Sequence, residues 1–347
     1  MRELTIQNRI INDESAPFVI AEIGHNHGGD LQVCKKMFAV AKECGVDAVK
    51  IQKRDNKTLY TKTFYDSVYN SENAFASTYG SHREALEFGA REYRELKNYA
   101  DKLGLIFFAT PFDFKSVDFL VKLGVPCFKT ASGDLTNIPL LEYIATKKKP
   151  MIISTGAATM RDVRRAFRAV HEINRNFTLL QCTAVYPVQA DQMNLRVIEA
   201  YRRSFPHTVI GLSDHYNGIV SGSIAYTLGA RVFEKHFTLD RTMKGTDHAF
   251  SLEPRGMTKF VRDLHKTRRS LGDGVKRQYP EEESARVKMG KKIVAARNLP
   301  RGHKIASGDL AFKSPGDGLH PYCFEKLCGR TLKSDLQKDD ALNLGHI

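Results

Sequence analysis

The chain has 347 residues, of which 42% are hydrophobic and 27% are charged, a composition typical of folded globular proteins and unlike disordered, collagen-like or disulfide-scaffold chains. Its 53 Lys and Arg residues against 39 Asp and Glu give a net charge of +14, which suits nucleic acid, anionic lipid or a small anionic substrate as a partner. The basic residues are spread along the chain without a recognisable nucleic-acid-binding module, so we expect a pocket for a small anion and no nucleic-acid partner.

The sequence contains neither a membrane-spanning segment nor a secretory signal. No apolar run approaches the roughly 20 residues that span a bilayer, and residues 1–17 have no apolar core ahead of a cleavage site. The six cysteines form no Cys-x-x-Cys pair, so we interpret them as reduced core thiols. These features predict a cytoplasmic protein that does not bind membranes.

Eight short β-rich runs alternate with segments of helical periodicity in the first three quarters of the chain. Eight such units in about 250 residues favour a (β/α)8 TIM barrel over an open doubly wound sheet, and no Gly-x-Gly-x-x-Gly motif follows the first run. The segment 55–87 breaks the alternation, and we expect a long loop there, on the functional rim. The eight runs cover residues 18–24, 47–52, 105–110, 127–132, 150–155, 177–183, 207–213 and 231–237.

The chain is predicted to contain two domains. Residues 1–271 form the barrel, and residues 272–290 form a polar linker. Residues 291–347 consist of short strand-like pieces with turn residues, which indicates a small β-rich domain that depends on docking for its stability.

Polar residues at the C-terminal ends of barrel strands face a shared mouth, where active sites of this fold are found. Two lysines and several hydroxyls occur at these strand ends, and together they suit an oxyanion such as phosphate because they supply charge-assisted hydrogen bonds. The candidate residues at the mouth are Lys50, Gln52, Thr110, Lys129, Ser132, Asp134, Ser154, Tyr186 and Ser213.

Two histidines follow neighbouring strands. His215 comes after the seventh run and His236 ends the eighth, so strands about 4.8 Å apart bring both imidazoles within reach of one cation. Carboxylates lie close in sequence, at Asp214, Glu234 and Asp247. A divalent metal with open coordination positions is one interpretation, and a hydrogen-bonded pair of rim histidines is the other.

Glu22 is an acid inside the apolar strand VIAEIG. An unpaired carboxylate would be costly there, so we expect Glu22 to face the mouth and meet a cation or a substrate hydroxyl, or else to form a buried salt bridge with Lys50. His25 and His27, in the turn that follows, are equally explained as turn residues.

At this point the ordered motifs resemble a known family, the sialic acid synthases, and the C-terminal segment is similar to that family's antifreeze-like (β-clip) domain. The resemblance covers almost the whole chain and implies phosphoenolpyruvate-dependent condensation with an open-chain aldose, such as N-acetylmannosamine, to give a 3-deoxy-2-keto sugar acid of the nonulosonate type and phosphate. The motifs are AEIGHNHGGD, AVKIQ, FFATPFD, FKTASGD, ISTGA, QCTAVYPV, GLSDH, FEKHFT and KGTDHAFSLEP.

The resemblance also implies roles for individual residues. His215 and His236 would hold a divalent ion that polarises the aldehyde, manganese in the first place with magnesium or cobalt as alternatives. Glu22 would act as general acid and base, assisted by Asp134 or Glu234. Phosphoenolpyruvate would be bound by Lys50, Thr110, Lys129, Ser132, Ser154 and Ser213, with Gln52, Tyr186 and Asp247 facing the sugar.

Four positions depart from the family's pattern. Ser314 stands where the family's arginine reaches across a dimer to the partner's sugar, Ala184 replaces a common Asn or Ser, Gln181 a frequent His, and Thr246 a frequent Pro. The acceptor therefore stays open, including an aldose without an acetamido group, a legionaminic- or pseudaminic-type precursor, and a phosphorylated sugar. The resemblance further implies a domain-exchanged homodimer.

Two other functions compete with this one. A metal-dependent pyruvate aldolase would use the same barrel without a phosphate site. A non-enzymatic surface- or ice-binding protein would use the antifreeze-like segment, although its sequence is basic and irregular where ice binding favours a flat, regular face.

Overall fold

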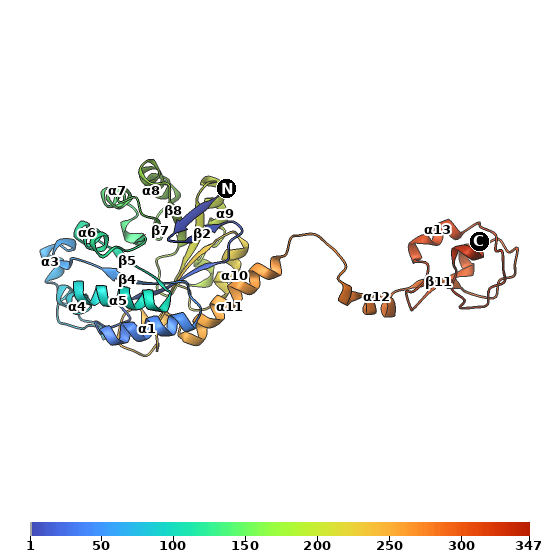
Figure 1. Ribbon diagram of the computed structural model, residues 1–347, viewed down its shortest axis with the longest axis horizontal. Coiled ribbons are helices and arrows are strands. Elements are labelled where there is room, and N and C mark those ends of the chain that lie inside the picture. Colours follow the sequence, from blue (N-terminus) through green and yellow to red (C-terminus); the bar gives the residue numbers. More distant parts are fainter. Residues whose placement is uncertain (1) are drawn as a thin grey trace. The chain divides into compact units, whose positions relative to one another are not determined.

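The computed structural model describes residues 2–347. The chain divides into two compact units, one that ends at Gly272 and one formed by Asp273–Ile347 (Figure 1). Each unit is described by itself.

The first unit is a closed barrel of eight parallel strands in the order β10-β3-β4-β5-β6-β7-β8-β9. This confirms the predicted (β/α)8 fold, and each predicted run contains most of one observed strand. The strands are β3 (Phe18–Gly24), β4 (Ala48–Lys53), β5 (Ile106–Pro111), β6 (Phe128–Thr130), β7 (Met151–Ser154), β8 (Phe177–Cys182), β9 (Val209–Asp214) and β10 (Val232–His236).

Helices follow the strands and cover the outside of the barrel (Figure 1). In α8, Thr159 caps the N-terminus together with Asp162, and Val163, Ala166 and Val170 form the buried stripe, at the spacing of one helix face. The long helices are α1 (Leu31–Glu43), α5 (Ala90–Leu103), α6 (Phe114–Leu123), α7 (Ile138–Thr146), α8 (Met160–Ile173), α9 (Val197–Ser204), α10 (Val220–Thr227) and α11 (Pro254–Leu271).

An antiparallel hairpin that the sequence analysis did not predict precedes the barrel. Its strands are β1 (Glu3–Ile6) and β2 (Arg9–Asn12). Leu4, Ile6 and Ile11 are fully buried in the barrel core. The Asn176 side chain, just before β8, accepts a hydrogen bond from the Thr5 N–H and donates one to the Thr5 carbonyl, both at 3.0 Å. The hairpin therefore packs against the N-terminal ends of the strands.

The predicted long loop after the second strand contains three short helices, α2 (Asn56–Leu59), α3 (Lys62–Tyr65) and α4 (Tyr79–Ala85). Gly80 is needed for their packing, because a Cβ at that position would lie 2.4 Å from the ring of Tyr65. The prediction of an irregular loop was therefore incomplete, because each helix spans only one or two turns and shows no periodicity in the sequence.

The second unit has its own small core, which includes Ile293, Leu299 and Leu327. Its elements are α12 (Glu283–Met289), β11 (Lys292–Ala295), β12 (Leu310–Lys313) and α13 (Phe324–Leu327), and β11 pairs with β12 in an antiparallel sheet. The predicted polar linker at 272–290 thus includes one helix.

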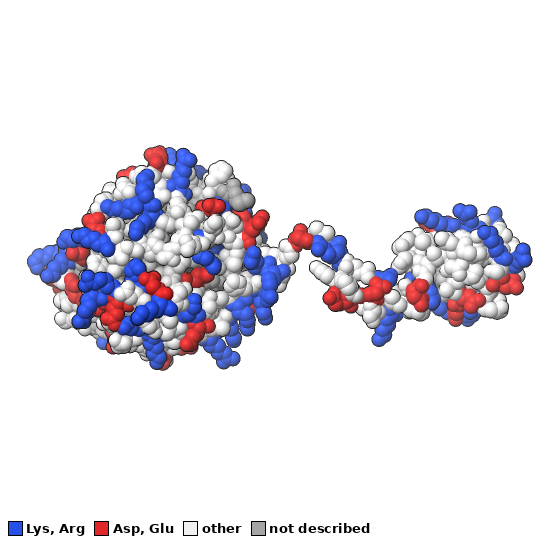
Figure 2. All heavy atoms as spheres, in the orientation of Figure 1, with Lys and Arg blue, Asp and Glu red and all other residues white. Residues whose placement is uncertain are grey.

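The surface of the first unit shows both signs of charge interspersed on the face drawn in Figure 2. All six cysteines are free, with four buried and two half-buried. Within residues 2–347, no helix has the length and apolar character needed to cross a membrane.

Candidate active site

A cavity of about 370 Å³ lies at the C-terminal ends of the barrel strands. It gathers all but one of the residues that the sequence analysis selected. The predicted residues that line it are Glu22, Lys50, Gln52, Thr110, Lys129, Ser132, Ser154, Tyr186, Ser213, His215, Glu234, His236 and Asp247.

Asp134 is the exception. It belongs to a short 3-10 turn after β6, Ser132–Asp134, and it does not line the cavity. Its carboxylate accepts a hydrogen bond from the Asn137 side chain at 3.3 Å. Burial raises the pKa of Asp134, and the Asn137 hydrogen bond together with the cavity residues Arg54 and Lys129 acts in the opposite direction.

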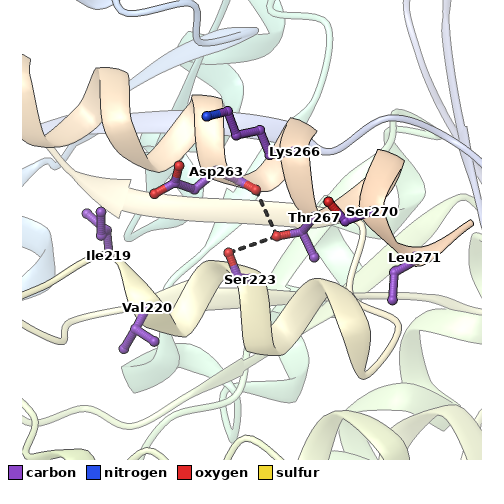
Figure 3. Close-up of a pocket in the computed structure, with 8 residues that line it drawn as sticks. All are labelled: Ile219, Val220, Ser223, Asp263, Lys266, Thr267, Ser270 and Leu271. Atoms are coloured by element: carbon purple, nitrogen blue, oxygen red, sulfur yellow. Dashed lines mark hydrogen bonds between the residues drawn. The ribbon is translucent and has the colours of Figure 1, made fainter. Parts of the chain in front are cut away.

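Another cavity, of about 540 Å³, lies on the outside of the barrel between α10 and α11 (Figure 3). Thr267 donates a hydrogen bond to Ser223 across it at 2.9 Å. Of its eight lining residues only Asp263 and Lys266 are charged, so it lacks the convergent polar groups found at the mouth.

Glu22 and Lys50 are the centre of the first strand pair. Their strands place them directly opposite one another, and the Lys50 ammonium lies 2.6 Å from a Glu22 carboxylate oxygen. Lys50 also donates to the Thr110 hydroxyl at 2.9 Å, and Gln52 donates to the other Glu22 oxygen at 2.8 Å. Both expectations for Glu22 are therefore realised, because it faces the mouth and forms the salt bridge.

Lys129 and Glu234 form a second charged pair, which is joined to the first because the Lys50 ammonium also lies 3.9 Å from a Glu234 oxygen. The Lys129 ammonium donates to the Ser154 hydroxyl at 2.6 Å and lies 3.6 Å from a Glu234 oxygen. The Ser213 hydroxyl donates to the same Glu234 oxygen at 3.3 Å. The two lysines of the mouth are thus each matched by a carboxylate, which the strand-end pattern alone did not reveal.

The two carboxylates differ in their preferred protonation state. Burial raises the pKa of Glu22, and the neighbouring Glu234 adds to this while Lys50 opposes it. Burial also acts to raise the pKa of Glu234, but Lys129 and Lys50 outweigh it and leave that pKa below its ordinary value. Glu22 is therefore the group of this pair that takes up a proton first, a division typical of acid and base sites.

His215 and His236 lie next to one another, with ring centroids 5.4 Å apart and ring planes inclined by 64°. The Nδ1 atom of His215 lies 2.9 Å from the Thr183 carbonyl, so it carries the hydrogen and leaves Nε2 as the lone pair. The Nδ1 atom of His236 is buried without a hydrogen-bond partner among the described residues, and an Asp247 oxygen lies 3.8 Å from it.

No group of three or more His, Cys, Asp or Glu side chains within residues 2–347 is arranged to hold a metal ion. The donor set at the mouth therefore consists of two imidazoles with one carboxylate nearby. The Tyr186 ring packs on His215 with centroids 4.1 Å apart and limits its movement.

The cavity also contains residues that the sequence analysis did not select. Arg54 directly follows β4, so its position at a strand end was an available signal, whereas Arg83 lies on α4, inside the segment interpreted as a loop. His25 joins them, and Phe112 packs under the Arg54 guanidinium at 3.7 Å.

Two of the four departures from the family pattern lie at the cavity, namely Ala184 and Thr246. Gln181 does not line it, and its side chain donates to the Met193 carbonyl at 3.2 Å. Ser314 is exposed in the second unit, where it donates to the Gly290 carbonyl at 2.9 Å.

Comparison with known proteins gives a consistent result. The chain is 40% identical to the N-acetylneuraminate-9-phosphate synthase of Homo sapiens, over 96% of this chain and 93% of that protein. It is 37% identical to the N,N'-diacetyllegionaminic acid synthase of Legionella pneumophila, over 95% of this chain and 94% of that protein. The crystal structure of an N-acetylneuraminic acid synthetase from Leptospira borgpetersenii in complex with citrate superimposes with a TM-score of 0.72 and 31% identity, over 82% of this chain and 95% of that one.

Two family profiles match the chain, one over most of the first unit and one within the second unit. The SAF domain matches residues 292–347, and the NeuB family matches residues 37–276. With these matches and a relative at 40% identity over nearly its full length, the chain belongs to the NeuB family, the family of the sialic acid synthases.

Proposed function

We propose that this protein condenses phosphoenolpyruvate with an open-chain aldose of the N-acetylmannosamine type, giving a 3-deoxy-2-keto sugar acid and phosphate. The observation that carries the proposal is the convergence, in one cavity at the barrel mouth, of two lysines and several hydroxyls with a pair of neighbouring imidazoles. The first set suits an enol phosphate, and the second suits a cation beside an aldehyde.

The donor groups of the histidine pair fit a divalent cation. The hydrogen bond from His215 Nδ1 to the Thr183 carbonyl orients that ring for coordination through Nε2, and the buried His236 Nδ1 has no hydrogen-bond partner among the described residues. Two nitrogens with a neighbouring carboxylate leave coordination positions free, as a Lewis-acid site requires. When bound, manganese would polarise the aldehyde oxygen and stabilise the alkoxide that develops there.

In the proposed reaction, C3 of phosphoenolpyruvate forms a bond to the aldehyde carbon, which leaves positive charge at C2. Water adds to C2, and the C–O bond of the resulting hemiketal phosphate breaks to release phosphate. A proton on Glu22 would end the charge pairing with Lys50 and so free the Lys50 ammonium for the phosphate. Glu22 would then pass its proton to the reacting oxygens, while Glu234 stays ionised. Asp134, which lies near the cavity residues Arg54 and Lys129, would assist Glu22 in moving the proton.

The remaining mouth residues receive binding roles. Lys129, Ser132, Ser154, Thr110 and Ser213 would hold the phosphate and carboxylate of phosphoenolpyruvate, and Gln52, Tyr186 and Asp247 would face the sugar. We further propose a homodimer that exchanges its C-terminal domains and a cytoplasmic location, the latter because all six cysteines are free thiols.

The test is a phosphate-release assay with phosphoenolpyruvate, manganese and a panel of aldoses, followed by the mass of the product. We expect phosphate release that requires both substrates, and a product equal in mass to the aldose plus the pyruvate unit. Formation of the same product from pyruvate without phosphate release would instead establish the aldolase.

A further inference from the structure

We infer that a buried ion pair, Asp214 with Lys235, positions the two imidazoles of the mouth and so sets how tightly a cation binds to them. The inference rests on the proposed function, because it concerns the proposed cation site. It gives a role to side chains that lie outside the cavity and that the proposed reaction does not use. The observation behind it is that one member of the pair directly precedes each histidine.

The ion pair joins the two strands that carry the histidines. Asp214 ends β9 and directly precedes His215. Lys235 lies on β10 and directly precedes His236. The register of β9 and β10 places Asp214 and Lys235 opposite one another. Both histidines line the cavity and neither member of the ion pair does, because successive side chains along a strand point to opposite faces. The pair therefore connects the strands behind the imidazoles, one residue before each.

The Asp214 carboxylate accepts hydrogen bonds from three donors. These are the Lys235 ammonium at 2.7 Å, the Ser221 hydroxyl on α10 at 2.5 Å and the Tyr216 N–H at 2.9 Å. Lys235 also donates to the Tyr216 carbonyl. The N–H and the carbonyl of Tyr216 are thus both held by the ion pair, which fixes the backbone that directly follows His215.

Backbone contacts hold the same histidines from other directions. The His215 carbonyl accepts a hydrogen bond from the Val188 N–H at 3.2 Å, and the His236 carbonyl accepts one from the Leu252 N–H at 2.9 Å. The His215 Nδ1 atom donates to the Thr183 carbonyl at 2.9 Å. Metal–ligand distances tolerate deviations of only about 0.2 Å, and loss of a group that orients a ligand typically weakens metal binding by roughly 10–100-fold. The ion pair supplies the restraint on the residue after His215, which these backbone contacts do not provide.

Stability alone does not account for a charged pair at this position. The side chains of Lys235 and Asp214 are 1% and 3% exposed. Replacement of both members of such a buried pair by apolar residues of similar volume is often neutral or stabilising. Apolar side chains, however, could not hold the N–H and the carbonyl of Tyr216. The charges therefore add a fixed direction of the chain at His215.

The experiment replaces both members of the pair, because removal of one would leave an unpaired buried charge. In the full-length variant Asp214→Leu/Lys235→Met, we expect the dissociation constant for manganese to rise roughly tenfold or more. Electron paramagnetic resonance of free manganese measures this constant and also the number of sites per chain. A role in stability alone would reduce the number of sites, since unfolded molecules offer none, and would leave the dissociation constant unchanged.

Ser221→Ala is a milder variant, which keeps the ion pair and removes one of the three donors. It should raise the dissociation constant by a smaller factor than the double variant does. The matched control is Thr178→Val, which removes another fully buried hydroxyl. This hydroxyl donates to the Val209 carbonyl at 2.8 Å, where β9 begins. Thr178→Val should therefore bind manganese as the wild type does.

A second measurement follows the His215 ring in the absence of metal. In protein with ¹⁵N-labelled histidine, nuclear magnetic resonance distinguishes the two neutral tautomers, and the spectrum of His215→Gln identifies the signal. The wild type should show the Nδ1–H form that the Thr183 carbonyl selects. The double variant, and to a smaller extent Ser221→Ala, should shift this signal toward the other form.

Support requires both a higher dissociation constant and an altered His215 signal. If either of them stays at its wild-type value in the double variant, the inference is overturned and the proposed function stands. If the double variant does not fold, Ser221→Ala is judged by the same two criteria. If the wild type binds no manganese, the proposed cation site fails, and the His215 signal alone decides the inference. Neither measurement involves turnover, so a failure to release phosphate would contradict the proposed function and leave the inference to these two measurements.

Discussion

The Glu22 carboxylate and the Lys50 ammonium lie 2.6 Å apart on adjacent parallel strands, both almost fully buried at the bottom of the mouth. Burial raises the pKa of Glu22 and Lys50 opposes this, so a proton that arrives at Glu22 changes what Lys50 can bind. This coupling makes Glu22 the residue whose replacement tests the proposed chemistry most directly.

Glu22→Gln should lower kcat by roughly 10²–10⁴-fold, the range for loss of a general acid or base. The amide keeps the shape and the hydrogen bond with Gln52 but cannot carry the proton. Steady-state phosphate release measures kcat, and calorimetry checks that phosphoenolpyruvate still binds. Asp101→Asn, at an exposed carboxylate on α5, is the comparison variant and should turn over normally. Wild-type turnover in Glu22→Gln would remove that residue from the mechanism.

His236→Gln should weaken manganese binding at least tenfold, because it removes one of two imidazole donors. Free manganese can be followed directly by electron paramagnetic resonance, so the result does not depend on activity. His207→Gln, at an exposed position on the first unit, should bind manganese as the wild type does. Unchanged affinity in His236→Gln would mean that the two rings form only a packed pair.

Lys235→Met should destabilise the barrel strongly. The Lys235 side chain is 1% exposed, and its ammonium lies 2.7 Å from Asp214. The ammonium also donates to the Tyr216 carbonyl, so the pair fixes the backbone on both sides of His215. Removing one partner of a buried pair costs about 3–5 kcal/mol, which corresponds to a fall of roughly 10 °C in melting temperature.

The control for this variant is Lys62→Met, which breaks the exposed Lys62–Asp66 pair on α3. Such pairs contribute at most about 1 kcal/mol, so its melting temperature should stay close to that of the wild type. Equal melting temperatures for Lys235→Met and Lys62→Met would contradict the prediction.

The stability of the first unit should fall as the pH drops below about 6.5. Burial lowers the pKa of His27 from 6.5 to about 3, so between these values the unfolded chain takes up a proton that the folded chain does not. Each such group reduces the free energy of unfolding by about 1.4 kcal/mol for every pH unit of acidification in this range. Burial also lowers the pKa values of His25 and His82, so these two residues add to the effect.

His27→Asn tests this pH dependence, because the amide oxygen replaces the Nδ1 acceptor of the Gly29 N–H without a titrating group. Urea unfolding at pH 7 and pH 5 should show a smaller difference in this variant than in the wild type. His207→Asn should retain the wild-type difference, and an identical difference in all three proteins would refute the prediction.

The barrel was predictable because its buried strands are short apolar runs at regular spacing, and strand ends in a parallel barrel meet at one mouth. That rule alone placed Lys50, Lys129, His215 and His236 in one cavity. The hairpin at residues 3–12 escaped prediction because its strands have only four residues each.

The position of a residue at a strand end does not predict the direction of side chains in the segments that follow the strands. Asp134 follows β6 in a short 3-10 helix whose first two residues line the cavity while Asp134 does not, and Arg83 reaches the cavity from α4. Likewise, the pairing of each lysine with a carboxylate depends on register across the barrel, because Glu234 comes from β10 and Lys129 from β6.

The hairpin of residues 3–12 also determines how the enzyme can be handled. Leu4, Ile6 and Ile11 seal the barrel floor, so a reactant has no route through the base and must arrive from the opposite end. A purification tag or surface tether at the N-terminus would therefore leave the mouth of the barrel accessible. Deletion of the hairpin would expose an apolar surface and promote aggregation.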